Sequence, residues 1–380
     1  MSLRDLLNKP REGGTRKIYA RYGVLKNPFP AAGQPSGNPH MRTEADDVIV
    51  DRLRVFERDN TSQVLVVEGT QGVGKTNFLN YYEKELEDLY SGEDGSYVIR
   101  YYPDPEPSFD GVLRRIFQEL GANHLARVAE VLNEKDDDEQ ERILQGVVRN
   151  QEVRNMLTAL SRSDDIASTA DIAMEWLLGV RVLNRHRDAL GIQFRLDTVE
   201  SRTQALRDLV EASIELGTLR GIFLLLDELE KQDLTLSKTT VLRYLLAIRA
   251  LVDALARNFF FLVAVTPEAK RRYFQMVPAF QGRLQNAVVL RPIATPNEGL
   301  RLFRFYVDEA RKGAKRELED ESGVPPAGTQ SFMSDAEVIK LFNTVLQQSA
   351  ARGVEGVTHR DFLNALHIAV EPQLAQAMTG

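Results

Sequence analysis

One eight-residue segment of this chain has the residue types and spacing of phosphate chemistry. The segment Gly69-Thr-Gln-Gly-Val-Gly-Lys-Thr76 fits the pattern G-x-x-x-x-G-K-[ST] and follows the apolar run Gln63–Glu68. Glycines let backbone amides wrap closely around a polyphosphate, and the start of the next helix adds positive potential. We therefore predict that ATP is bound by consecutive loop residues, namely Gly69, Thr70, Gln71, Gly72, Val73, Gly74, Lys75, Thr76 and Asn77.

Four side chains have predicted roles in ATP hydrolysis. Lys75 is expected to reach the β- and γ-phosphates, and the Thr76 hydroxyl to hold Mg²⁺. Asp227 and Glu228 follow the apolar run Gly221–Leu226. Acids at the carboxyl end of a parallel strand lie where such sheets bind ligands, so Asp227 is expected to hold Mg²⁺ and Glu228 to polarise the attacking water. The alternative is that the two acids merely cap a helix.

Composition excludes several other classes of protein. The 380 residues contain no cysteine, which rules out disulfides, thiolate metal sites and cysteine nucleophiles. The formal net charge of −7 argues against a uniformly basic nucleic-acid coat. The sequence shows no run of about 18 apolar residues and no secretory signal, so we expect a cytoplasmic protein without membrane contact.

Apolar runs alternate with helical patterns over most of the chain. Wholly apolar strands are typical of parallel sheets that are buried on both faces, and strands alternating with helices predict an α/β fold. We expect four parts: an N-terminal basic arm and loop at 1–42, a nucleotide-binding core at 43–121 and 198–292, a helical insertion at 122–197, and a helical lid domain at 293–380. Within the insertion, Glu134–Arg142 is interpreted as a solvated charged face and Trp176 as a core or interface residue.

The N-terminal arm concentrates positive charge. Residues 1–30 contain seven cationic side chains, with Tyr19 and Tyr22 interleaved: Arg4, Lys9, Arg11, Arg16, Lys17, Arg21 and Lys26. Two interpretations stay open, an arm that contacts DNA or an acidic partner, and a solvated terminus.

The order of these pieces resembles the AAA+ ATPases. In that family the strand after the acid-bearing strand ends in a polar residue called sensor 1, which corresponds here to Thr266 after Phe259–Val265; the same residue also suits a helix N-cap before Pro267. The run from Pro278 to Ile293 and the turn Asn27-Pro28-Phe29 resemble the branch of origin-recognition initiators, transposon target-selection ATPases and secretion-associated ATPases. The resemblance covers about residues 20–120 and 200–370, and the long insertion departs from it.

The resemblance implies two functional arginines and several partners. Arg283 matches the arginine that reaches the γ-phosphate of a neighbouring subunit, with Arg271 and Arg272 as alternatives, and Arg360 matches the sensor 2 arginine of the lid. The resemblance implies a homo-oligomer, either a ring or a helical filament, that binds ATP and Mg²⁺ and assembles on DNA. A signalling or scaffold ATPase that recruits a protein effector without nucleic acid remains the alternative, and a nucleotide-binding module with little turnover is a third.

Overall fold

The computed structural model describes residues 19–31, 37–90, 95–102, 107–284, 286–320 and 328–376. The chain forms two compact units. We call the first the helical unit (Met1–Thr43, Gly69–Phe78 and Leu290–Gly380) and the second the sheet unit (Glu44–Glu68 and Leu79–Val289). The phosphate-binding loop predicted from the sequence thus belongs to the helical unit, and the acid-bearing strand belongs to the sheet unit.

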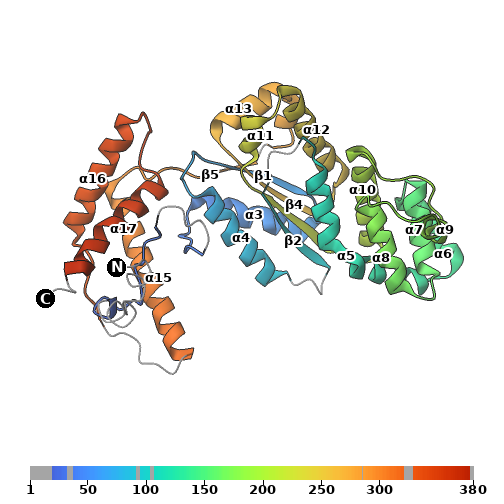
Figure 1. The fold of residues 1–380 in the computed structure, drawn as a ribbon, viewed down its shortest axis with the longest axis horizontal. Helices are drawn as coiled ribbons and strands as arrows, with labels where there is room; N and C mark the ends of the chain where they lie inside the picture. The colour runs from blue at the N-terminus through green and yellow to red at the C-terminus, as the bar shows by residue number, and fades with distance from the viewer. Residues whose placement is uncertain are drawn as a thin grey trace, which may run out of the picture. The chain divides into compact units, whose positions relative to one another are not determined.

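The sheet unit is built on one five-stranded parallel sheet (Figure 1). The strand order is β2-β3-β4-β1-β5, and the strands are β1 (Gln63–Glu68), β2 (Ser96–Tyr101), β3 (Gly221–Leu226), β4 (Phe259–Val265) and β5 (Asn286–Val289). All residues of β3 and β4 are buried. This arrangement confirms the predicted α/β fold with a parallel-sheet P-loop core.

Side chains of the central strands bury alternately on the two faces of the sheet. On one face Leu224 and Phe261 belong to a large core that also contains residues of the following helices. On the other face Phe223 packs against Phe56 and Tyr90, with ring centroids 5.2 and 4.4 Å apart. Because both faces of the sheet are covered, the strand sequences are continuously apolar and do not alternate between apolar and polar residues.

The helices of the sheet unit, apart from those of the insertion, alternate with its strands along the chain. They are α3 (Glu44–Asp59), α4 (Lys75–Leu89, whose first turn belongs to the helical unit), α5 (Asp110–Asn133), α10 (Val199–Glu215), α11 (Gln232–Thr235), α12 (Lys238–Ala254), α13 (Pro267–Met276) and α14 (Pro278–Gln281), with a short 3-10 turn at Leu229–Lys231. Helix α5 continues to Asn133, with a kink at Gly121, whose φ of 69° is left-handed.

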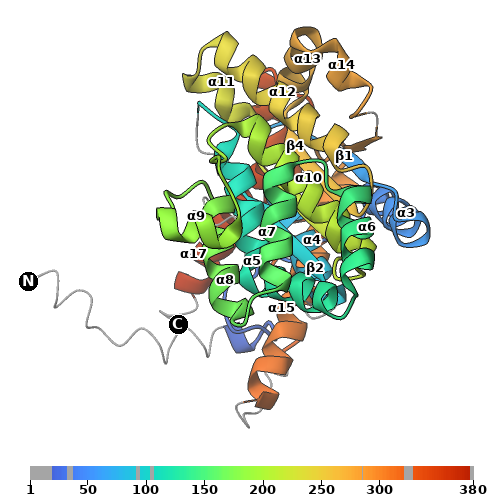
Figure 2. The same ribbon diagram turned by 90° about the vertical axis from the view of Figure 1, so that its right-hand side faces the viewer.

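The helical insertion adds α6 (Asp137–Val147), α7 (Gln151–Ser161), α8 (Ile166–Leu177) and α9 (Asn184–Leu190), which lie beside α5 and α10 (Figure 2). Trp176 is buried, and its indole donates a hydrogen bond of 3.0 Å to the carbonyl oxygen of Phe194. The tryptophan is therefore a core residue, as predicted. Asp136 caps α6 by accepting the backbone N–H of Glu139, so the charged run Glu134–Arg142 contains the start of this helix.

The helical unit contains α15 (Pro296–Asp320), α16 (Asp335–Ala351) and α17 (His359–Gln376). Its core includes Tyr19, Tyr22 and Phe29 from the N-terminal segment. The ring of Tyr22 stacks on Phe332 at 4.1 Å, and the backbone N–H of Phe29 donates to the Asn27 side chain at 3.0 Å.

Neither interpretation of the N-terminal arm anticipated these two buried tyrosines. Tyr19, Tyr22 and Phe29 belong to the core of the helical unit, where their rings are buried. Five of the cationic residues lie outside the described residues: Arg4, Lys9, Arg11, Arg16 and Lys17. Among the described helices, none combines the length and the apolar character needed to span a membrane.

Candidate functional site

The phosphate-binding loop joins the end of β1 to the start of α4. Gly72 and Gly74 have φ angles of 82° and 103°, a region that side-chain-bearing residues rarely adopt. A Cβ atom added to Gly74 would meet nothing within 4 Å, so space lies open on that side of the loop. Both glycines therefore take backbone conformations that a residue with a side chain would adopt only with strain.

The Lys75 side chain lies over its own loop. It is 8% exposed, and its ammonium donates to the carbonyl oxygens of Gly69 and Thr70 at 2.8 and 3.4 Å. The buried Thr70 hydroxyl makes no hydrogen bond to any described residue. A buried hydroxyl without a partner is uncommon in proteins and fits a site that receives a polar ligand.

The start of α17 lies against the same loop. The backbone N–H of Arg360 donates to the carbonyl oxygen of Gly72 at 3.0 Å, and a Cβ atom added to Gly72 would lie 3.2 Å from the Thr358 hydroxyl. The exposed Arg360 side chain thus extends from backbone that is tied to the phosphate-binding loop. Its neighbour His359 is partly buried. Desolvation is the largest cause, and the charge of the nearby His40 the second, of a pKa of His359 lowered to about 4.

The two acids follow β3 in the sheet unit. Asp227 is fully buried, and its carboxylate lies 2.8 Å from the Nη2 atom of Arg100. Glu228 has a left-handed backbone with φ 49°, and its N–H donates to the Asp227 carboxylate at 2.9 Å. The Glu228 carboxylate pairs with the Lys231 ammonium at 2.6 Å. Both acids are therefore bound to cations of the same chain.

The strand register brings two predicted functional positions of the sheet unit to one edge of the sheet. Glu68 of β1 pairs with Val265 of β4, and Leu226 of β3 pairs with Val263 of β4. Asp227 follows β3 and Thr266 follows β4, so both lie at the carboxyl edge. Ligands of parallel sheets bind at this edge.

This chain matches no family and no curated protein. Among solved structures it is similar to the Aeropyrum pernix ORC2 protein in its ADPNP–ADP complexes. The two share 13% identity over 88% of this chain and 69% of the other, with a TM-score of 0.40. At this level the similarity carries no argument about function.

Thr266 acts as a helix cap in the resting structure. Its hydroxyl accepts the backbone N–H of Ala269 at 3.3 Å, so the N-cap interpretation is confirmed. In the first turn of the same helix, the Lys270 ammonium pairs with the Glu68 carboxylate at 2.5 Å. The sensor 1 role of Thr266 stays a prediction.

Each of the three candidate arginines for action in a neighbouring subunit has a partner within its own chain. The Nε atom of Arg283 lies 2.5 Å from the Asp253 carboxylate, and the Arg283 side chain is 51% exposed. Arg271 and Arg272 are also exposed and pair with Glu268 and Asp233. Exposed pairs of this kind are weak and easily exchanged, so the geometry leaves Arg283 able to bind another partner.

Sequence reasoning missed two cations that contact the predicted catalytic acids, Arg100 and Lys231. Arg100 is a charged residue inside the otherwise uncharged strand β2, and that irregularity was the available signal. A buried arginine needs a carboxylate partner, and the acids after the neighbouring strand are obvious candidates.

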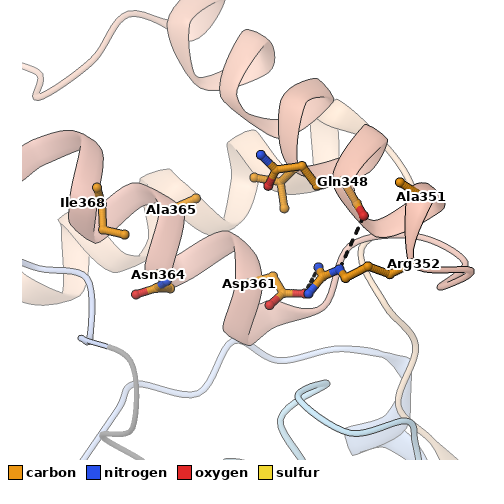
Figure 3. Close-up of a pocket in the computed structure, with 8 residues that line it drawn as sticks. Gln348, Ala351, Arg352, Asp361, Asn364, Ala365 and Ile368 are labelled. Carbon is orange, nitrogen blue, oxygen red and sulfur yellow. Dashed lines mark hydrogen bonds and ion pairs between the residues drawn. The ribbon is translucent and has the colours of Figure 1, made fainter.

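A surface cavity of about 530 Å³ lies between α16 and α17 (Figure 3). The ion pair between Arg352 and Asp361, at 2.9 Å, lies at its wall, and Ile368 is exposed there. The cavity is lined by none of the residues predicted to bind nucleotide. It is therefore distinct from the phosphate-binding loop.

Proposed function

We propose that this chain is an ATPase of the AAA+ type that binds ATP with Mg²⁺ and hydrolyses it. The observation that carries the proposal is the loop Gly69–Thr76. Two of its glycines have left-handed backbones, the Lys75 ammonium lies inside it, and a buried hydroxyl at Thr70 is unbonded among the described residues. Each feature suits a bound polyphosphate. The loop also follows a parallel strand, as the motif requires.

The roles of the side chains follow from their chemistry. Lys75 exchanges the loop carbonyls for phosphate oxygens, and the backbone amides of the loop orient the triphosphate. The Thr76 hydroxyl and the Asp227 carboxylate supply oxygen ligands of the kind that Mg²⁺ prefers. Bound Mg²⁺ neutralises phosphate charge. Glu228, once it leaves Lys231, orients the attacking water and accepts its proton.

The decisive test is Lys75→Ala. Removing the ammonium should weaken binding of a fluorescent ATP analogue by at least about tenfold and abolish turnover, because one strong charge-assisted contact to phosphate is lost. Lys84→Ala is the matched control, since Lys84 is an exposed lysine of the same helix. If the Lys75 variant binds and hydrolyses ATP like the parent protein, the proposed function is wrong.

We further propose that ATP drives assembly of the chain on DNA. The support is the basic N-terminal sequence and a half-exposed Arg283 that is held only by a surface ion pair. Sedimentation with a non-hydrolysable ATP analogue, with and without DNA at low salt, should show larger particles only with nucleotide, and retention of DNA that falls as salt rises. Particles of unchanged size that retain no DNA at low salt would rule this out.

The second candidate is an ATPase that recruits a protein effector. Phe194 and Leu183 of the insertion are 69% and 55% exposed. The Phe194 carbonyl oxygen accepts a hydrogen bond from the Trp176 indole, and the Phe194 backbone N–H donates to the Glu152 carboxylate. The Phe194 ring therefore extends from backbone that is held by hydrogen bonds on both sides. Exposed aromatic anchors are typical of protein interfaces. If Phe194→Ser abolishes capture of an effector from nuclease-treated extract, while ATP turnover is unchanged, this candidate is favoured over DNA assembly.

A further inference from the structure

Asp227 and Arg100 form a buried ion pair between neighbouring strands. The side chains of Asp227 and Arg100 are 0% and 5% exposed, and the distance between Oδ2 and Nη2 is 2.8 Å. Arg100 lies beside Leu225 in the parallel register of β2 and β3, two residues before Asp227. The pair is thus set by the sheet itself, and it involves the carboxylate that the proposed function assigns to the metal.

The guanidinium of Arg100 is only partly bonded to Asp227. Its Nε and Nη1 atoms are buried and make no hydrogen bond to any described residue. Two other acceptors from α4 lie near it: the Asn80 side-chain oxygen at 3.4 Å and the Glu83 carboxylate at 4.0 Å. Among the described residues, Arg100 therefore has donors that make no hydrogen bond, and a second carboxylate, that of Glu83, lies 4.0 Å away.

We propose that Arg100 is a resident counter-ion of Asp227 that a divalent cation displaces, and that Glu83 receives the displaced guanidinium. The proposal rests on the proposed function, because that function brings the cation to Asp227. A buried carboxylate without a counter-ion is costly, so Arg100 stabilises the chain when nucleotide is absent. Two cations at one carboxylate repel each other, so Arg100 also weakens metal binding until it turns towards Glu83. Arg100 is a positioning residue in this scheme.

The test is Arg100→Gln in the full-length chain. Binding of a fluorescent ATP analogue is followed as Mg²⁺ is titrated, and thermal unfolding is measured with and without Mg²⁺ and ATP. We expect the Mg²⁺ concentration at half-maximal binding to fall about tenfold, because a nearby positive charge is removed. We also expect a lower unfolding temperature without ligand, and recovery of most of that loss with Mg²⁺ and ATP.

A matched control separates this role from a purely structural one. Arg202 is also a buried arginine of the sheet unit, and it is paired with Asp110. Arg202→Gln should lower the unfolding temperature and leave the Mg²⁺ midpoint unchanged. If Arg100→Gln behaves in the same way, with a midpoint within twofold of the parent protein, the proposal is overturned.

A second variant, at the carboxylate that receives Arg100, should shift the Mg²⁺ midpoint in the opposite direction. Glu83→Gln should raise the Mg²⁺ midpoint about threefold or more, because Arg100 then has no alternative carboxylate. Glu87→Gln, one turn further along α4, removes the same charge, and Glu87 makes no ion pair with Arg100 among the described residues. Equal shifts in these two variants overturn the proposal even if Arg100→Gln does not fold.

The failure of this proposal and that of the proposed function look different. If the parent protein binds no nucleotide at any Mg²⁺ concentration, both are rejected. If the parent protein binds nucleotide with Mg²⁺ but the midpoints of the Arg100 and Glu83 variants do not move, only the counter-ion role is rejected.

Discussion

Replacing Glu228 with glutamine isolates the catalytic step from folding and from nucleotide binding. The glutamine keeps the length and shape of the side chain and removes only the negative charge. The left-handed backbone at this position, with φ 49°, costs about 1 kcal/mol for either residue. The substitution therefore adds no backbone strain.

The expected loss of stability is small. The Glu228 and Lys231 side chains are 39% and 43% exposed, so solvent screens their ion pair. A pair of this kind contributes at most about 0.5 kcal/mol, which corresponds to a change in unfolding temperature of about 2 °C or less. A positioned general base, by contrast, contributes about 100- to 10,000-fold in rate, or about 3–5 kcal/mol of barrier.

Three measurements on Glu228→Gln check this reasoning. Steady-state phosphate release should fall by at least about 100-fold. Binding of a fluorescent ATP analogue and the unfolding temperature should stay close to the values of the parent protein. Lys231→Gln serves as the paired variant, because it removes the same ion pair and leaves the carboxylate free to act. Unchanged phosphate release by Glu228→Gln would show that this carboxylate is not the base.

Two further predictions concern a buried histidine and Arg283, the candidate for action in a neighbouring subunit. Burial, then the charge of Arg127, lowers the pKa of His124 from 6.5 to about 3, so folded His124 stays neutral while the unfolded chain takes up a proton below pH 6.5. The contribution of neutral His124 to the free energy of unfolding is therefore full above pH 6.5 and falls by about 1.4 kcal/mol per pH unit below it. Between pH 7 and 5, the free energy of unfolding measured in urea should fall by about 2 kcal/mol more for the parent protein than for His124→Gln. If Arg283 acts on a neighbouring subunit, Arg283→Ala and Glu228→Gln should each be inactive alone and recover part of the phosphate release when mixed. If assemblies verified to contain both variants recover no phosphate release, Arg283 does not act on a neighbouring subunit.

The elements of the sheet were readable because each depends on a short run of residues. Phe259–Val265 is wholly apolar and buried on both faces, and its observed bounds equal the expected ones. The ends of helices, which are set by local dihedral angles, were harder to predict from the sequence. Helix α12 stops at Ala254, because Leu255 leaves the helical region with ψ 75°. The N-terminal aromatics were missed for a related reason: their burial depends on helices about 300 residues later in the chain, which no local pattern reports.

Local and long-range features also differ in the candidate site: the groups that could do chemistry were predictable from the sequence, and the long-range ion pair of Asp227 was not. A phosphate-binding loop is a local device, since its glycines, lysine and hydroxyl are consecutive residues whose backbone alone forms the cradle. The cation that pairs with Asp227 is not local: Arg100 and Asp227 are 127 positions apart and meet only because β2 and β3 are neighbours. A sequence pattern therefore predicts which groups can act on a triphosphate. The fold decides which cations of the chain pair with those groups.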